Sequence, residues 1–193
     1  MGLLGRASRL LSISDSRGIL RRYLVVNGFD GALTMLGLII GFVVSSSAEL
    51  DVIFNACVAA AIALGMSGIS SAWVSEVAER KRELSDLEEA MLVDLGDSAH
   101  GQAARWVPLL VALVNGGAPL LISLLIITPL WVAQSGVLLP VSPLYLSICI
   151  AAVVIFVLGI LLGRIADVSW ARSGIRTVAI AALTVVLIYI FTG

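Results

Sequence analysis

The residues of this sequence most suited to unusual chemistry are polar side chains inside a long apolar run near the N-terminus. Asn27, Asp30 and Thr34 lie three and four residues apart, so a helix would carry them on one face. A carboxylate deep in a bilayer costs about 2.5 to 3.5 kcal/mol even on the lenient insertion scale, and it usually faces a partner, a water-filled cavity or an ion. Asp30 is therefore a candidate cation ligand. The alternative is a carboxylate near the polar end of the run that forms only local hydrogen bonds.

Two further apolar runs contain residues that could act with Asp30. Met66 lies in the small-residue segment 65–71, and its thioether is an ordinary packing group unless it faces Asp30. A carboxylate with a thioether would suit a borderline transition-metal ion better than Mg²⁺ or Ca²⁺. The segment Asn115–Pro119 could free backbone carbonyls at mid-membrane depth, as broken helices of transport sites do, or could form a packing kink. The candidate pathway residues are Asp30, Met66, Asn27 and Asn115, with Asp30 and Met66 as candidate metal ligands.

Eight carboxylates follow the second apolar run, between Glu76 and Asp97. At 100° per residue, six of them fall within an arc of about 80° on one helix face. Only three basic residues, 80–82, lie among them, and like charges three or four positions apart destabilise a bare helix. The face could be simply solvated, with pairs such as Glu79 and Arg82, but a bound cation would relieve the repulsion. We favour metal gathering by Glu76, Glu79, Glu83 and Asp86.

The composition indicates which elements position these residues. Of 193 residues, 60% are hydrophobic and 13% are charged, and the mean hydropathy is +1.08. A soluble domain usually has about 25% charged residues, and a chain of this size could not bury such an apolar surplus. The sequence therefore predicts an all-α membrane protein with five transmembrane helices. The predicted spans are Leu24–Ser46, Val52–Val74, Trp106–Thr128, Leu144–Gly163 and Gly174–Phe191.

Two segments outside the spans have their own patterns. Residues 1–22 hold five arginines and one aspartate among leucines and isoleucines, which is typical of a basic amphipathic helix lying on the membrane surface. Residues 23–193 form the five-span domain. No proline or glycine lies between Gly68 and Gly96, so we expect the second helix to extend into the cytoplasm as an acidic helix within residues 75–100.

The basic residues predict the orientation. All twelve fall before the first span, between the second and third, or between the fourth and fifth. The positive-inside rule then places the N-terminus in the cytoplasm and the C-terminus outside, in a multi-pass cell membrane protein.

Several function classes are poorly supported by the sequence. A net charge of −1 argues against binding of nucleic acid. His100 is the single histidine, and the sequence has neither a Cys-x-x-Cys pair nor a Walker loop. The serines of the spans have no nearby base. We therefore expect no enzymatic activity and no permanently bound cofactor.

The run NGFDGALTMLGLIIGF in the first span resembles the Asp-Gly signature that opens the vacuolar iron transporter family, also called the iron- and manganese-transporting nodulin-like family. The second helix with Met66, its acidic extension SEVAERKRELSDLEEAML and the run NGGAPLL in the third span follow in that family's order. The resemblance covers residues 21–193 and is strongest to the short prokaryotic, archaeal branch. The well-studied members carry three cytoplasmic helices, where this chain offers one long helix and a short segment up to Trp106.

The resemblance implies a homodimer with its translocation path between the two first helices, which exports Fe²⁺ or Mn²⁺ from the cytosol in exchange for protons. It implies that Asp30 and Met66 are the pathway aspartate and methionine. It also implies that Glu76 and Glu79, with Glu83 and Asp86, collect metal at the cytoplasmic mouth. The residues alone leave two other functions open. One is a non-transporting scaffold or regulator whose acidic helix docks a basic partner, and the other is a passive cation channel.

Overall fold

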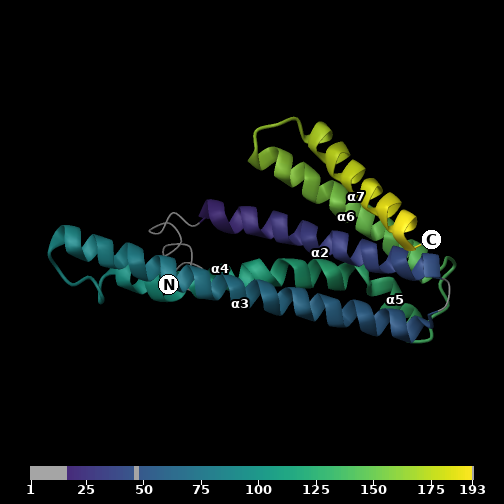
Figure 1. Ribbon diagram of the computed structural model, residues 1–193, viewed down its shortest axis with the longest axis horizontal. Coiled ribbons are helices and arrows are strands. Elements are labelled where there is room, and N and C mark those ends of the chain that lie inside the picture. Colours follow the sequence, from purple (N-terminus) through teal and green to yellow (C-terminus); the bar gives the residue numbers. More distant parts are fainter. Residues whose placement is uncertain (1–16, 46–47, 193) are drawn as a thin grey trace.

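The computed structural model describes residues 17–45 and 48–192, and within these ranges it contains helices and no strand (Figure 1). Five of the helices are long and apolar enough to cross a membrane, which confirms the prediction of an all-α chain with five such elements and indicates a multi-pass membrane protein. The helices are α2 (Arg17–Ser45), α3 (Leu50–Met91), α4 (Ala99–Ile126), the short α5 (Thr128–Gln134), α6 (Pro143–Ile165) and α7 (Trp170–Thr192).

Two boundaries differ from those predicted. Residues 17–22, expected in a separate amphipathic helix, form the first turns of α2, while the rest of that predicted helix lies outside the described residues. The acidic extension ends at Met91 rather than near residue 100. Leu92 adopts a left-handed conformation with φ of 53°, and its backbone N–H bonds to the Glu88 carbonyl. Ser98 then caps α4, because its hydroxyl oxygen accepts from the backbone N–H groups of His100 and Gly101.

Helices α3 and α4 form a long antiparallel pair that projects beyond the start of α2 (Figure 1). Glycines allow their backbones to approach closely. A Cβ atom added to Gly68 would lie 2.7 Å from the Cα atom of Gly116, and one added to Gly116 would overlap the carbonyl oxygen of Gly65. Small residues permit this approach in membrane helices, where packing replaces the hydrophobic effect as the force that joins helices.

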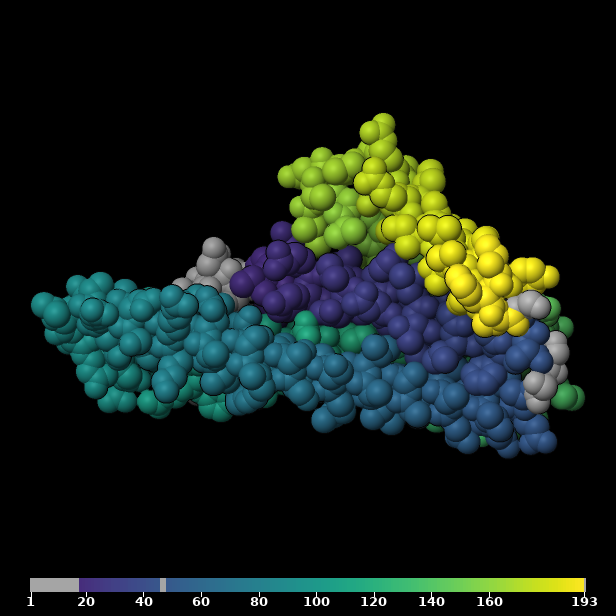
Figure 2. Space-filling view, in the orientation of Figure 1, coloured from purple at the N-terminus to yellow at the C-terminus, as the bar shows by residue number. Residues whose placement is uncertain are grey.

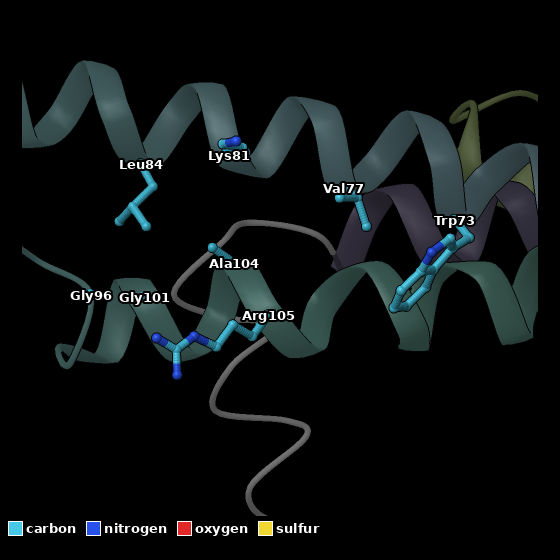
Figure 3. A pocket seen from close by; sticks show the side chains of 8 residues that line it. All are labelled: Trp73, Val77, Lys81, Leu84, Gly96, Gly101, Ala104 and Arg105. Carbon is cyan, nitrogen blue, oxygen red and sulfur yellow. The ribbon is translucent and has the colours of Figure 1, made fainter.

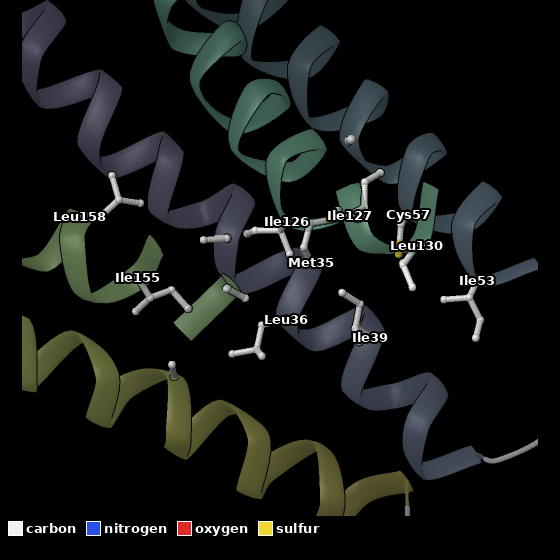
Figure 4. Packing of buried hydrophobic residues seen from close by; sticks show 14 of the residues in the cluster. Met35, Leu36, Ile39, Ile53, Cys57, Ile126, Ile127, Leu130, Ile155 and Leu158 are labelled. Atoms are coloured by element: carbon white, nitrogen blue, oxygen red, sulfur yellow. The ribbon is translucent and has the colours of Figure 1, made fainter. Parts of the chain in front are cut away.

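Helix α2 lies between the α3–α4 pair and the α6–α7 hairpin (Figure 1). The largest core side chains meet around α2 and include Met35, Ile39, Ile126, Leu130 and Ile155 (Figure 4). Helices α6 and α7 contact each other closely where Gly159 packs against Thr177. The Thr177 hydroxyl also donates a hydrogen bond to the Ile155 carbonyl at 3.2 Å. Part of α2 stays at the surface between α3 and this hairpin (Figure 2).

The basic residues of the described ranges gather at one end of the molecule. They lie in the first turns of α2, the last part of α3, the beginning of α4, the last turn of α6 and the beginning of α7. Because these helices alternate in direction, all of these segments belong to the end from which α2 starts (Figure 1). The other end contains the last turn of α2, the first turn of α3, α5 and the last turn of α7.

Candidate functional site

Asp30 is an exposed residue in the middle part of α2. The next residue, Gly31, packs on α4, where an added Cβ atom would lie 2.7 Å from the Pro119 carbonyl oxygen. The Thr34 hydroxyl donates to the backbone carbonyl of Asp30 at 2.8 Å, but within residues 17–45 and 48–192 the Asp30 carboxylate has no hydrogen bond or ion pair. The alternative of a locally hydrogen-bonded carboxylate is therefore not seen in this part of the chain.

A polar network joins three helices next to Asp30. The side-chain Nδ2 of Asn27 on α2 donates to Oδ1 of Asn115 on α4 at 2.5 Å. Nδ2 of Asn115 in turn donates to the backbone carbonyl of Gly68 on α3 at 2.8 Å. Helix α4 runs from Ala99 to Ile126 without interruption, so the segment around Asn115 is a close-packing site and not a broken helix. Asn27 and Asn115 thus bind each other in the structure.

The network sets the relative depth of Asp30 and Met66. Asp30 lies three residues beyond Asn27 along α2, and Met66 lies two residues before Gly68 along the antiparallel α3. At 1.5 Å per residue, Asp30 lies about 4.5 Å and Met66 about 3 Å from the level of Asn115 along the helix axes. Both are displaced toward the end of the molecule at which α2 finishes. Met66 is 56% exposed, so both side chains are at the outer surface of one chain. Within the described residues, no three His, Cys, Asp or Glu side chains form a group that could hold a metal ion.

The acidic extension of α3 contains an internal counter-charge. Arg80 is 7% exposed and Glu76 is 8% exposed, and Nε of Arg80 lies 3.4 Å from Oε2 of Glu76. The same guanidinium donates through Nη1 to Oε2 of Glu83 at 2.6 Å. Two of the four acids predicted to gather metal are therefore held by an arginine. Glu79 and Asp86 are exposed and form no ion pair with other described residues, Arg82 included.

Sequence reasoning missed this role of Arg80. The three basic residues 80–82 were judged too few to neutralise the acids. However, Glu76 and Glu83 lie at the i−4 and i+3 positions of Arg80, and opposite charges at this spacing pair on a helix. The burial of the pair is a property of the tertiary structure and could not be read from that spacing.

Comparison with known proteins identifies an archaeal relative. The chain is 30% identical over 171 residues to the uncharacterized protein MJ0645 of Methanocaldococcus jannaschii, an alignment that covers 87% of this chain and 86% of the relative. This chain belongs to the family of that archaeal protein. No protein-family model and no solved structure matches the chain. Because the relative has no assigned function, the function of this chain is inferred from the geometry above.

Proposed function

We propose that this protein is a divalent transition-metal transporter, which exports Fe²⁺ or Mn²⁺ from the cytosol in exchange for protons along a path between two copies of the chain. The observation that supports the proposal is the Asp30 carboxylate, which is exposed on a membrane-length helix and has no partner within the described residues. Contact with lipid would cost this group about 2.5 to 3.5 kcal/mol, so we infer that a protein surface or an ion covers it.

A second copy packed against this face would supply the missing ligands. It would bring two Asp30 carboxylates and two Met66 thioethers to one depth, a set of ligands that a borderline ion such as Fe²⁺ accepts and that a single chain does not assemble. Because a carboxylate must lose its proton to bind metal, metal loading releases a proton and protonation releases the metal. This competition at Asp30 couples the two fluxes.

The acidic extension would serve as the entrance. Its acids lie at the end where the described basic residues gather, and the positive-inside rule assigns this end to the cytoplasm. Glu79, Glu83 and Asp86 are exposed there, and together they would raise the local concentration of divalent cations near the path.

Flux measurements with Asp30→Asn protein in proteoliposomes test the proposal. We expect Fe²⁺ and Mn²⁺ transport driven by a proton gradient to fall by at least about 10-fold, since weaker perturbations of metal sites already cost that much. Asp167→Asn is the matched control, because Asp167 is an exposed carboxylate in the α6–α7 connection whose φ of 51° an asparagine also tolerates.

The outcomes separate the proposal from its rivals. Transport by Asp30→Asn at the rate of the control would overturn the role of Asp30. Metal flux through the native protein that does not depend on the pH gradient would indicate a passive channel. The absence of any metal flux would indicate a scaffold or regulator.

A further inference from the structure

An open groove lies between the extended part of α3 and the beginning of α4, outside the candidate transport site. Its volume is about 350 Å³, and its walls come from one face of α3, from the first turns of α4 and from the connection between them (Figure 3). The residues that matter for its chemistry are Trp73, Val77, Lys81, Leu84, Ala104 and Arg105.

The charge of this groove is opposite to that of the surrounding helix. The extension and the connection that follows it hold eight carboxylates between residues 76 and 97, yet none of them lines the groove, whereas Lys81 and Arg105 both do. Neither cation has an ion pair or hydrogen bond within the part of the chain that the structure describes. Two unneutralised cations beside one cavity favour an anionic occupant.

The two cations come from different helices. A side chain leans toward the N-terminus of its own helix, and α3 and α4 are antiparallel. The Arg105 side chain follows this rule and extends along α4 toward Gly101 (Figure 3). Each helix thus contributes one cation to the lining of the groove.

The remaining walls are apolar and lead back to the membrane-length part of α3. Val77 and Trp73 stand one and two turns from Lys81 on the same face, and Trp73 is 41% exposed. Tryptophan is enriched at membrane–water interfaces. A soluble anion would contact the cations and leave this apolar wall in water, whereas a lipid would cover it.

We propose that the groove binds an anionic phospholipid, with its phosphate between Lys81 and Arg105 and a hydrocarbon chain along Val77 and Trp73. Basic pockets between membrane helices bind such headgroups for the same reason, because the low dielectric of the interface strengthens the attraction between phosphate and cations. The site is independent of the proposed metal transport, since it uses none of the same residues.

Fluorescence quenching of Trp73 tests the site. The chain has four tryptophans, so Trp106→Phe, Trp131→Phe and Trp170→Phe leave Trp73 as the reporter. The full-length protein is placed in phosphatidylcholine nanodiscs that contain a rising fraction of brominated phosphatidylglycerol or, in parallel, brominated phosphatidylcholine. We expect phosphatidylglycerol to quench Trp73 at a several-fold lower fraction. In the Lys81→Gln/Arg105→Gln variant this preference should disappear, because each cation contributes about fivefold to the binding of an anionic lipid.

The control variant, Arg82→Gln/Arg164→Gln, removes two exposed cations from the same end of the molecule, neither of which lines the groove. It should keep the preference for phosphatidylglycerol. Equal loss in both variants would reveal only a general surface attraction and would overturn the proposal, as would equal quenching by the two lipids in the native groove. Displacement of the brominated lipid by glycerol 3-phosphate would show a soluble-anion site instead. Lys81→Gln alone, an exposed substitution, repeats the test if the double variant does not fold.

Discussion

Among single residues, Asn115 has the clearest structural role, because its side-chain amide connects three helices. It accepts a hydrogen bond from Asn27 on α2 and donates one to the Gly68 carbonyl on α3. Inside a membrane no bulk water replaces a lost partner, so each of these groups depends on the others. The sequence singled out Asn27 and Asn115 as polar residues in apolar runs but did not show that they bind each other.

We expect Asn115→Leu to lower the free energy of unfolding by about 1 to 2 kcal/mol, because two hydrogen bonds are lost and the Asn27 amide is left without its acceptor. Unfolding in detergent, followed by circular dichroism, measures the change. Asn55→Leu is the control, since Asn55 is exposed on a membrane-length part of α3. Equal stability of the two variants would contradict the role of the network.

At the scale of helices, α3 has more length than a membrane needs. Its 42 residues span about 63 Å at 1.5 Å per residue, about twice the thickness of a hydrocarbon core. The excess length is not a lone solvated helix, because α4 packs along α3, and Glu76 and Arg80 of the extension are buried. The acidic extension is therefore one half of an antiparallel helix pair.

We expect Arg80→Met to lower the unfolding free energy by about 3 kcal/mol, because the change leaves the buried Glu76 carboxylate without its counter-charge. If the extension gathers metal, millimolar Mn²⁺ should raise the melting temperature of this variant more than that of the native protein, since the ion replaces the guanidinium between Glu76 and Glu83. Thermal unfolding with and without Mn²⁺ measures both the loss of stability and the rise in melting temperature caused by the ion. Arg82→Met, at an exposed position, should show neither effect.

For the molecule as a whole, the arrangement of the helices leaves both candidate pathway ligands, Asp30 and Met66, uncovered. Helix α2 packs against α4, α6 and α7, yet Asp30 stays exposed, and so does Met66 on α3. A carboxylate on a membrane-length helix usually faces protein, a water-filled cavity or an ion. A second copy is the occupant that the proposed function requires.

Cross-linking tests that arrangement. Val26 is 43% exposed and lies one turn before Asp30 on the same face of α2. In a background without Cys57 and Cys149, Val26→Cys should give a covalent dimer with a short bismaleimide in native membranes. Leu183→Cys on α7, which is 58% exposed, should remain monomeric. Equal cross-linking at both positions, or at neither, would speak against a dimer contact at this face of α2.

The features that could be predicted from the sequence are those that depend on one segment of the chain alone. The five membrane-length helices were predicted correctly, because apolar length and the lack of backbone partners in lipid are properties of each segment alone. The short α5 was not predicted, since its seven residues lie in a stretch with neither the length nor the periodicity that reveals a helix. The pairing of Arg80 with Glu76 and Glu83 was within reach, because it depends only on local spacing.

Contacts between distant residues had no such local signal. Asn27 meets Asn115 across 88 positions only because Gly31 fits against Pro119 and Gly68 against Gly116, and these fits depend on which helix faces turn toward each other. The groove with Lys81 and Arg105 likewise exists because α4 returns along α3. Amino-acid types along the chain decide where helices begin and how apolar they are. Shape complementarity between helices decides which polar groups meet and which, like Asp30, stay uncovered.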